Sequence, residues 1–119
     1  MERPMMMGGS EMLHVLSIGL VVAAFFAAGV FNAIGTQANK NNFIRWGYPQ
    51  WWCHLTGGLE MVTAVLVALP GSREAGLILG AVIVAAAVLT VLRHRDFSHL
   101  VPLGVFAALI ALAETYGRV

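Results

Sequence analysis

The stretch WWCHLTGGLEMVTAVLVALP, residues 51–70, is apolar enough to cross a lipid bilayer, yet it carries a carboxyl group, Glu60, near its middle. A membrane-spanning helix needs roughly 20 apolar residues. The whole chain has a membrane composition, because 59% of its 119 residues are hydrophobic and 11% are charged. Soluble domains carry about 45–50% apolar and about 25% charged residues. The sequence therefore predicts an integral membrane protein in which Glu60 lies inside the bilayer.

Charge and cysteine content exclude several classes of protein. A net charge of +1 leaves no basic stripe that could neutralise phosphates, so we expect no nucleic-acid partner. Cys53 is the only cysteine, which excludes an intramolecular disulfide and a redox-active cysteine pair. Quinone-reducing enzymes that work through such a pair are therefore excluded as well.

Four apolar segments of suitable length follow one another along the chain. The predicted spans are residues 12–35, 51–70, 76–92 and 98–116, preceded by a flexible tail at residues 1–11. GSREA (71–75) and RHRDF (93–97) are interpreted as tight turns, which make neighbouring helices antiparallel. The longer connector TQANKNNFIRWGYPQ (36–50) starts polar and ends aromatic, as expected of an aromatic flap at the headgroup level. We therefore predict an all-α fold, an integral membrane four-helix antiparallel bundle.

The second predicted span has one face of small and polar residues and one of bulky aliphatic residues. At about 100° per residue, the residues on the same face as Glu60 are Cys53, Thr56, Gly57, Thr63, Ala64 and Val67. The opposite face carries Leu55, Leu59, Val62, Leu66 and Leu69. In membrane helices small residues face other helices and bulky ones face lipid. Glu60 is therefore predicted to point into the bundle.

Polar and aromatic groups gather at one end of the predicted bundle. Asn32, His54 and His99 lie near span ends on the side of the long connector, and Glu60 lies about 9 Å deeper than His54. We predict a pocket open to one face, with Glu60, Asn32 and His54 as candidate catalytic residues. The predicted ligand-binding residues around it are Trp46, Tyr48, Trp51, Trp52, Cys53, Thr56 and His99.

Burial of Glu60 in the membrane allows a functional or a purely structural interpretation. A charged carboxylate at the bilayer centre costs about 2.5–3.5 kcal/mol, whereas a neutral acid avoids this cost and can donate a hydrogen bond, for example to Asn32. A purely structural role is the alternative, since a hydrogen bond between membrane helices contributes about 0.6 kcal/mol on average. We favour a functional role, because ionisable groups inside spans are usually retained for a purpose.

Two stretches of the chain resemble the DoxX and DoxX-like family. They are FFAAGVFNAIG (25–35) and GYPQWWCHLTGGLEMVTAVLVALPGSREAGLILGAVIVAAAVL (47–89). The recurring elements are a glycine in the first helix, a loop ending near Gly-Tyr-Pro, a Pro-Gly turn and an alanine-rich third helix. The most distinctive element is TGGLE (56–60), which places Glu60 after a pair of glycines. The resemblance covers about residues 23–113.

The resemblance implies a small four-helix protein of the bacterial cytoplasmic (inner) membrane. It also implies a link to quinone-coupled oxidation of sulfur compounds or to oxidative-stress complexes. Many relatives carry a lysine after the first-helix glycine, where this chain reads Gly29-Val30-Phe31-Asn32. A buried ion pair with Glu60 is therefore not available, and an Asn32–Glu60 hydrogen bond is the expected replacement.

The leading hypothesis is a DoxX-like membrane protein that binds a lipid-like or quinone-like molecule and serves a membrane oxidoreductase. A second is an acid/base enzyme of isomerase or epoxide hydrolase type that acts on an apolar small molecule, with Glu60 as proton donor. A third is a small proton-coupled transporter, although such transporters carry their glutamate in the first span. Haem b between His54 and His99 and a ligand-free assembly subunit complete the set. We expect no resident cofactor and no metal ion, and whether a reaction is catalysed stays open.

Glycines predict how the helices meet. Gly57, Gly76 and Gly80 are expected at helix–helix contacts, where backbones approach closely. Gly76 and Gly80 are spaced four apart on the third span and also offer a face for self-association. We therefore predict a homodimer or a complex with a partner membrane subunit.

Overall fold

The computed structural model describes residues 8–116, and every regular element within this range is helical. The elements in chain order are α1 (Gly9–Ile34), α2 (Gln37–Arg45), α3 (Trp52–Ala68), the 3-10 helix η1 (Pro70–Ser72), α4 (Arg73–Arg93), the 3-10 helix η2 (Phe97–His99) and α5 (Leu100–Tyr116). Residues 1–7 of the predicted tail lie outside the described residues, but residues 9–11 are helical rather than part of a tail. The reason is local, because Glu11 Oε1 accepts a hydrogen bond from Gly8 N at 2.9 Å and so satisfies the start of α1.

Three segments of the described chain are long and apolar enough to cross a membrane, namely Glu11–Ile34, Pro70–Arg93 and Phe97–Tyr116. The helix α3 is also apolar but shorter. Together with the composition, these segments define an all-helical, multi-pass membrane protein. Within residues 8–116 the structure has five α-helices where the sequence predicted four, and the additional one is α2.

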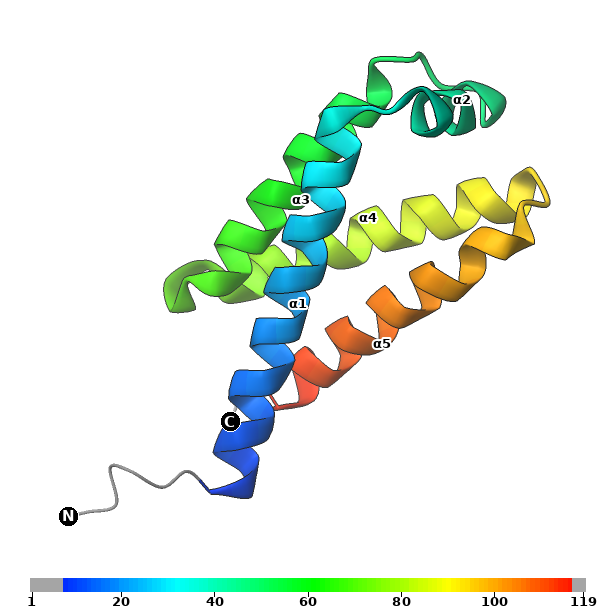
Figure 1. The fold of residues 1–119 in the computed structure, drawn as a ribbon. Helices are drawn as coiled ribbons and strands as arrows, with labels where there is room; N and C mark the ends of the chain where they lie inside the picture. Colours follow the sequence, from blue (N-terminus) through cyan, green and yellow to red (C-terminus); the bar gives the residue numbers. More distant parts are fainter. Residues whose placement is uncertain (1–7, 117–119) are drawn as a thin grey trace.

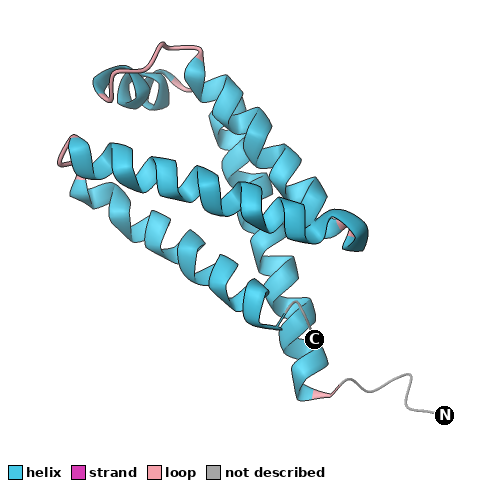
Figure 2. Cartoon of the chain, turned by 180° about the vertical axis from the view of Figure 1, so that it is seen from behind, coloured by secondary structure: helices cyan, strands magenta, loops and turns pink. Residues whose placement is uncertain are grey.

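The long helices form two antiparallel pairs that cross each other. Figure 1 shows α1 and α3 side by side, with the α4–α5 hairpin crossing them. Each helix of one pair contacts the other pair, because α1 packs against α3 and α5, and α4 packs against the same two helices. Seen from behind in Figure 2, the α4–α5 turn and α2 lie on the same side of the molecule.

The α1–α3 contact depends on two glycines that let the backbones touch. A Cβ atom on Gly57 would lie 2.5 Å from the backbone nitrogen of Ala33 and 2.6 Å from the carbonyl oxygen of Gly29. A Cβ atom on Gly29 would in turn lie 2.9 Å from the carbonyl oxygen of Gly57. The prediction that Gly57 lies at a helix contact is therefore confirmed, and Gly29 is its partner.

Gly76 and Gly80 are also helix contacts, as predicted, but their partners are inside the chain. A Cβ atom on Gly76 would lie 2.7 Å from the backbone nitrogen of Val67 in α3. A Cβ atom on Gly80 would lie 3.0 Å from the ring of Phe25 in α1. The prediction that this pair forms a self-association face is wrong, because α3 and α1 already cover both glycines.

An apolar core lies where the two helix pairs cross. Phe25 is buried there and meets Phe106 of α5 edge-to-face, with ring centroids 5.1 Å apart. The cluster around Phe25 also contains Ile18, Val21, Ala64, Val67, Leu77, Val84, Ile110 and Ala113. It draws on all four long helices, so its packing holds the two pairs together.

The connectors differ from the sequence prediction in two places. The first connector contains α2, whose N-cap Thr36 accepts a hydrogen bond from Asn39 N at 3.2 Å. It is therefore a short helix followed by an aromatic loop, and not only a flap.

The predicted turn at residues 71–75 begins and ends earlier, because α4 already starts at Arg73. The side chain of Arg73 donates to the carbonyl groups of Val67 and Ala68 at the end of α3, which closes the turn within η1.

Candidate functional site

The predicted face of α3 is confirmed around Glu60. The buried residues of this helix are Cys53, Gly57, Glu60, Thr63, Ala64 and Val67. On the opposite face, Leu55, Leu59, Val62 and Leu69 are exposed. Glu60 is 9% exposed, and small neighbours on its own face leave room for the side chain beside α1.

A chain of hydrogen bonds connects Glu60 to α2 through α1. Asn32 Nδ2 donates to Glu60 Oε1 at 2.6 Å, and Asn39 Nδ2 donates to Asn32 Oδ1 at 2.7 Å. Asn39 is buried, and its backbone nitrogen is bound by the N-cap of α2. The three side chains, called the buried amide chain below, thus come from α2, α1 and α3 in turn.

The direction of the Asn32–Glu60 hydrogen bond differs from the one expected. The sequence predicted a neutral Glu60 donating to Asn32, but the amide oxygen of Asn32 is turned toward α2, where it accepts from Asn39 Nδ2. The Asn32 amide nitrogen therefore faces the carboxyl group, and Glu60 accepts. The pairing itself was predicted correctly, while its direction depends on Asn39, which the sequence analysis did not consider.

His54 lies apart from the buried amide chain. Its Nδ1 is 2.8 Å from the carbonyl oxygen of Ala33 near the end of α1, and because a carbonyl only accepts, Nδ1 carries the proton. The ring lies against Gly35, which ends α1 in the left-handed conformation with φ 67°. The last carbonyls of a helix lack partners within it, so His54 satisfies one of them. The structure does not bring this exposed ring to Glu60.

The predicted aromatic residues separate into two groups. Tyr48 and Trp52 stack with ring centroids 5.3 Å apart and planes 4° from parallel, and Trp51 leans on Trp52. The Tyr48 hydroxyl lies 2.8 Å from Thr90 Oγ1, so this group joins the loop after α2 to α4. Trp46 belongs to the second group, which surrounds a carboxylate on the α4–α5 turn.

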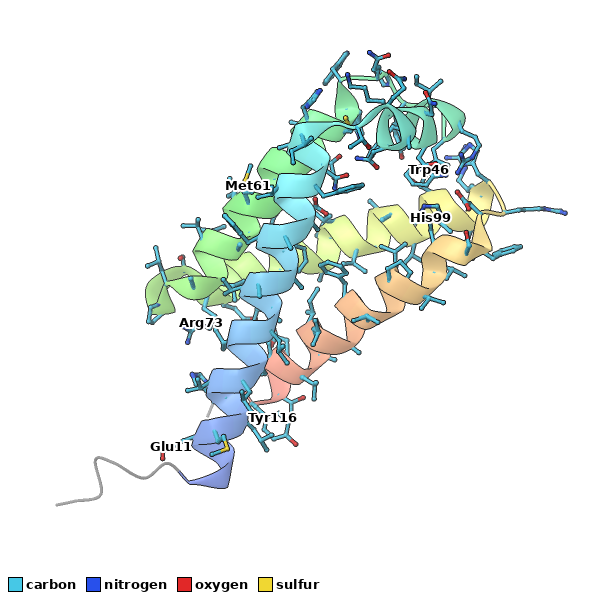
Figure 3. The ribbon with its side chains drawn as sticks, viewed as in Figure 1. Glu11, Trp46, Met61, Arg73, His99 and Tyr116 are labelled. Carbon is cyan, nitrogen blue, oxygen red and sulfur yellow. The ribbon has the colours of Figure 1, made fainter. Side chains whose placement is uncertain are left out.

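That carboxylate is Asp96, which the sequence analysis missed. It accepts hydrogen bonds from Arg45 and, at 3.1 Å, from Trp46 Nε1, and its other oxygen lies 3.0 Å from His99 Nδ1. Trp46 and His99 also meet edge-to-face, and Figure 3 shows these two labelled residues near each other. These four residues are called the Asp96 cluster below. They lock the end of α2 onto the α4–α5 turn.

The pKa of Asp96 is lowered from 3.8 to about 2, chiefly by the hydrogen bond from Arg45. Partial burial acts in the opposite direction, and the contacts with His99 and Trp46 lower the pKa further. The carboxylate therefore stays charged through the whole physiological range. His99, which was predicted to bind a ligand, is engaged in this cluster.

The last two predicted site residues lie on the buried face of α3. Cys53 is buried and free. Thr56 uses its hydroxyl within its own helix, because Oγ1 donates to the carbonyl oxygen of Trp52 at 2.9 Å. Within residues 8–116 no three His, Cys, Asp or Glu side chains are arranged to hold a metal ion. His54 and His99, the ring pair considered for haem, are each held by different partners.

The fold and the buried amide chain define a multi-pass helical membrane protein in which the carboxyl group of Glu60 is buried between α1 and α3. The profile of the DoxX-like family matches residues 16–113, and the chain belongs to that family. The resemblance inferred from residues 23–113 is thereby confirmed, and the match extends it toward the start of α1. Comparisons with curated proteins and with solved structures gave no match.

Proposed function

We propose that the chain binds a quinone-like or lipid-like molecule at the buried amide chain and serves as a membrane subunit of an oxidoreductase. The observation that carries this proposal is the run of hydrogen bonds from Asn39 through Asn32 to Glu60. It leads from a polar helix at one end of the molecule to a carboxyl group on an apolar helix. In this proposal the polar head group of the ligand binds to these side chains, between the apolar helices α1 and α3.

The proposal includes a fourth membrane span. The 17 residues of α3 correspond to about 25 Å at about 1.5 Å per residue, which is near the lower limit for a span. With α1, α4 and α5 this completes an antiparallel four-helix bundle in a bacterial inner membrane. In that arrangement α2 lies at the headgroup level, and ligand enters from the side on which it lies.

Magnitudes favour a ligand-binding role over a purely structural one. A carboxylate inside a membrane helix costs about 2.5–3.5 kcal/mol. A single hydrogen bond between membrane helices returns about 0.6 kcal/mol on average, and Asn32 supplies one to Glu60. The hydrogen bond therefore offsets only part of the cost of burying Glu60. An apolar residue at position 60 would pack without this cost, so the carboxyl group is better explained by a role in binding.

The donors and acceptors of the buried amide chain suit a ligand head group with carbonyl or hydroxyl oxygens. Each asparagine amide has two N–H donors, and the bonds along the chain use one from Asn32 and one from Asn39. The carboxyl group of Glu60 adds a second oxygen to the one that Asn32 binds. A quinone accepts hydrogen bonds from the amides, and its reduced form donates to the carboxyl group. Because Cys53 is the only cysteine, this protein has no redox-active cysteine pair that could reduce the quinone. In this proposal a partner subunit supplies the electrons.

Native mass spectrometry of the protein purified in mild detergent tests the proposal through the quinones and lipids that co-purify. Glu60→Ala removes the polar anchor and is expected to weaken ligand binding by about 5- to 150-fold, as leaving a ligand group unpaired costs about 1–3 kcal/mol. Glu60→Gln keeps an oxygen for Asn32 and is expected to retain most of the ligand. A proton-coupled transporter would behave differently, because glutamine cannot release a proton and transport would stop.

Thr63→Val is the matched control. Thr63 is fully buried on the same face of α3, and its hydroxyl donates to the carbonyl oxygen of Leu59 in its own helix at 2.9 Å. The substitution preserves shape and removes a polar group outside the buried amide chain, so bound ligand should not change. Equal amounts of the same molecules in wild type, Glu60→Ala and Thr63→Val would show that Glu60 has no role in binding.

A further inference from the structure

A groove lies on α1 at the end of the molecule opposite to α2. It follows one face of α1 from His14 to Phe26, is bordered by Ala68 and Arg73, and has a volume of about 480 Å³. At about 1.5 Å per residue the lining stretch of α1 is about 18 Å long. It is open along its length, as a groove that faces lipid would be, and it shares no residue with the buried amide chain.

The floor of the groove is made by a glycine that helix packing does not require. A Cβ atom on Gly19 would meet no atom within 4 Å, whereas a Cβ atom on Gly29 in the same helix would clash with α3. Gly19 and Ala23 are one turn apart on the helix and therefore share a face. Between larger neighbours such as Phe26, these two small residues leave a trough whose lining is mainly apolar.

The polar residues that line the groove are Arg73 and His14. Arg73 Nε donates to Val67 O at 2.8 Å, and Nη2 donates to Ala68 O at 3.3 Å, so the guanidinium is fixed at the end of α3. An arginine has five N–H donors, and these bonds leave the others for a ligand. His14 Nδ1 lies 3.0 Å from the carbonyl oxygen of Tyr116, which anchors that ring to the end of α5. Figure 3 shows Arg73 and Tyr116 on either side of α1.

The position of the guanidinium matches the depth of a lipid phosphate. Arg73 is the first residue of α4, directly after the turn that ends α3, and it lies close to the start of the candidate span Pro70–Arg93. Arginine binds phosphate through paired, charge-assisted hydrogen bonds, and basic pockets between membrane helices bind lipid head groups. The guanidinium and the apolar trough along α1 match the two parts of one molecule, a charged head group and an acyl chain.

We propose that this groove binds an anionic phospholipid, with its phosphate on Arg73 and one acyl chain along α1 over Gly19. The proposal is independent of the function proposed for Glu60, because the two sites lie at opposite ends of α1. A neutral lipid fills the trough equally well but lacks the net negative charge that the guanidinium favours. An anionic lipid is therefore expected to bind at least about tenfold more tightly than a neutral lipid with the same acyl chains.

The test is native mass spectrometry of the full chain titrated with phosphatidylglycerol or with phosphatidylcholine of identical acyl chains. Gly19→Leu fills the trough from a position where an added Cβ atom meets nothing within 4 Å, and it is expected to remove the tightly bound phosphatidylglycerol. Arg73→Gln is expected to abolish the preference for phosphatidylglycerol. Because Arg73 also holds the end of α3, circular dichroism of this variant must show wild-type helix content. If it does not, Gly19→Leu alone decides the outcome.

Gly104→Leu provides the matched control. Gly104 lies exposed on α5, and a Cβ atom there would also meet nothing within 4 Å, so the same enlargement is made outside the groove. Wild-type binding by Gly104→Leu together with loss in Gly19→Leu supports the proposal. Tight binding that survives Gly19→Leu, equal affinity for the two lipids, or equal loss in Gly104→Leu overturns it.

Discussion

The α1–α3 interface and the contact between α2 and the α4–α5 turn both join helices through polar side chains, but they do so in different surroundings. At the first, Glu60 is buried, and the backbones touch at Gly29 and Gly57. At the second, Arg45 is 53% exposed and pairs with Asp96 beyond the end of α4. One interface therefore excludes water and the other is open to it.

This difference decides which forces matter at each place. In the buried interface a lost hydrogen bond leaves a polar group without a partner, and an added methyl group has no space to occupy. In the Asp96 cluster water and salt compete with the ion pair, so its contribution is small and depends on conditions. Substitutions should accordingly have large effects that are insensitive to salt at α1–α3, and small effects sensitive to pH and salt at the Asp96 cluster.

The largest effect is expected at Gly57. Gly57→Val forces a side chain against the backbone of α1, where a Cβ atom already lies 2.5 Å from Ala33 N. Because backbone cannot move aside as a side chain can, we expect a loss of about 3 kcal/mol in the free energy of unfolding. Unfolding by denaturing detergent, followed by circular dichroism, measures it.

The neighbouring glycine is the control for this prediction. A Cβ atom on Gly58 would meet nothing within 4 Å, so Gly58→Val should change the free energy of unfolding by less than about 0.5 kcal/mol. Similar losses for the two variants would mean that the close approach of α1 and α3 does not determine stability.

An intermediate effect is expected along the buried amide chain. Asn32→Ala leaves both Glu60 and Asn39 without a partner and should cost about 2 kcal/mol, whereas Asn39→Ala leaves only Asn32 and should cost about 1 kcal/mol. Gln37→Ala removes an exposed hydrogen bond to Asn41 on α2 and should be nearly neutral. The same unfolding measurement ranks the three variants. A greater loss of stability for Asn39→Ala than for Asn32→Ala would contradict the central position of Asn32 in the buried amide chain.

Part of this comparison could be predicted from the sequence because it rests on local patterns. Small residues recur at helical spacing on one side of α3, which predicted the buried face of Glu60 and the close approach at Gly57. The buried face needs only helix geometry and the length of a span. The pairing of Asn32 with Glu60 came from the family resemblance, because many relatives carry a lysine after the first-helix glycine.

The remainder depends on contacts that no local pattern records. Asp96 pairs with Arg45 at a separation of 51 residues, and only the crossing of the helix pairs brings the two together. His54 was assigned to the pocket by depth, but Gly35 ends α1 so that a free carbonyl lies beside the ring. The helix α2 was missed because it is short and polar, and Thr36, a good N-cap residue, was the one available signal.

The smallest effect, and the one that depends most on solution conditions, is expected at Asp96. Because its pKa falls from 3.8 to about 2 on folding, the folded protein binds the acidic proton less tightly than the unfolded chain. The resulting stabilisation is complete above about pH 4 and is lost as the pH falls toward about 2.

The fluorescence of Trp46, whose indole nitrogen contacts the carboxylate, should change over this interval, and Trp46→Phe identifies its share of the signal. Asp96→Asn keeps the shape without the charge, so it should show no such change and should resemble the wild type at about pH 2. Added salt should weaken the wild-type contact at neutral pH. A transition of the same size in Asp96→Asn would show that another group controls the docking of α2.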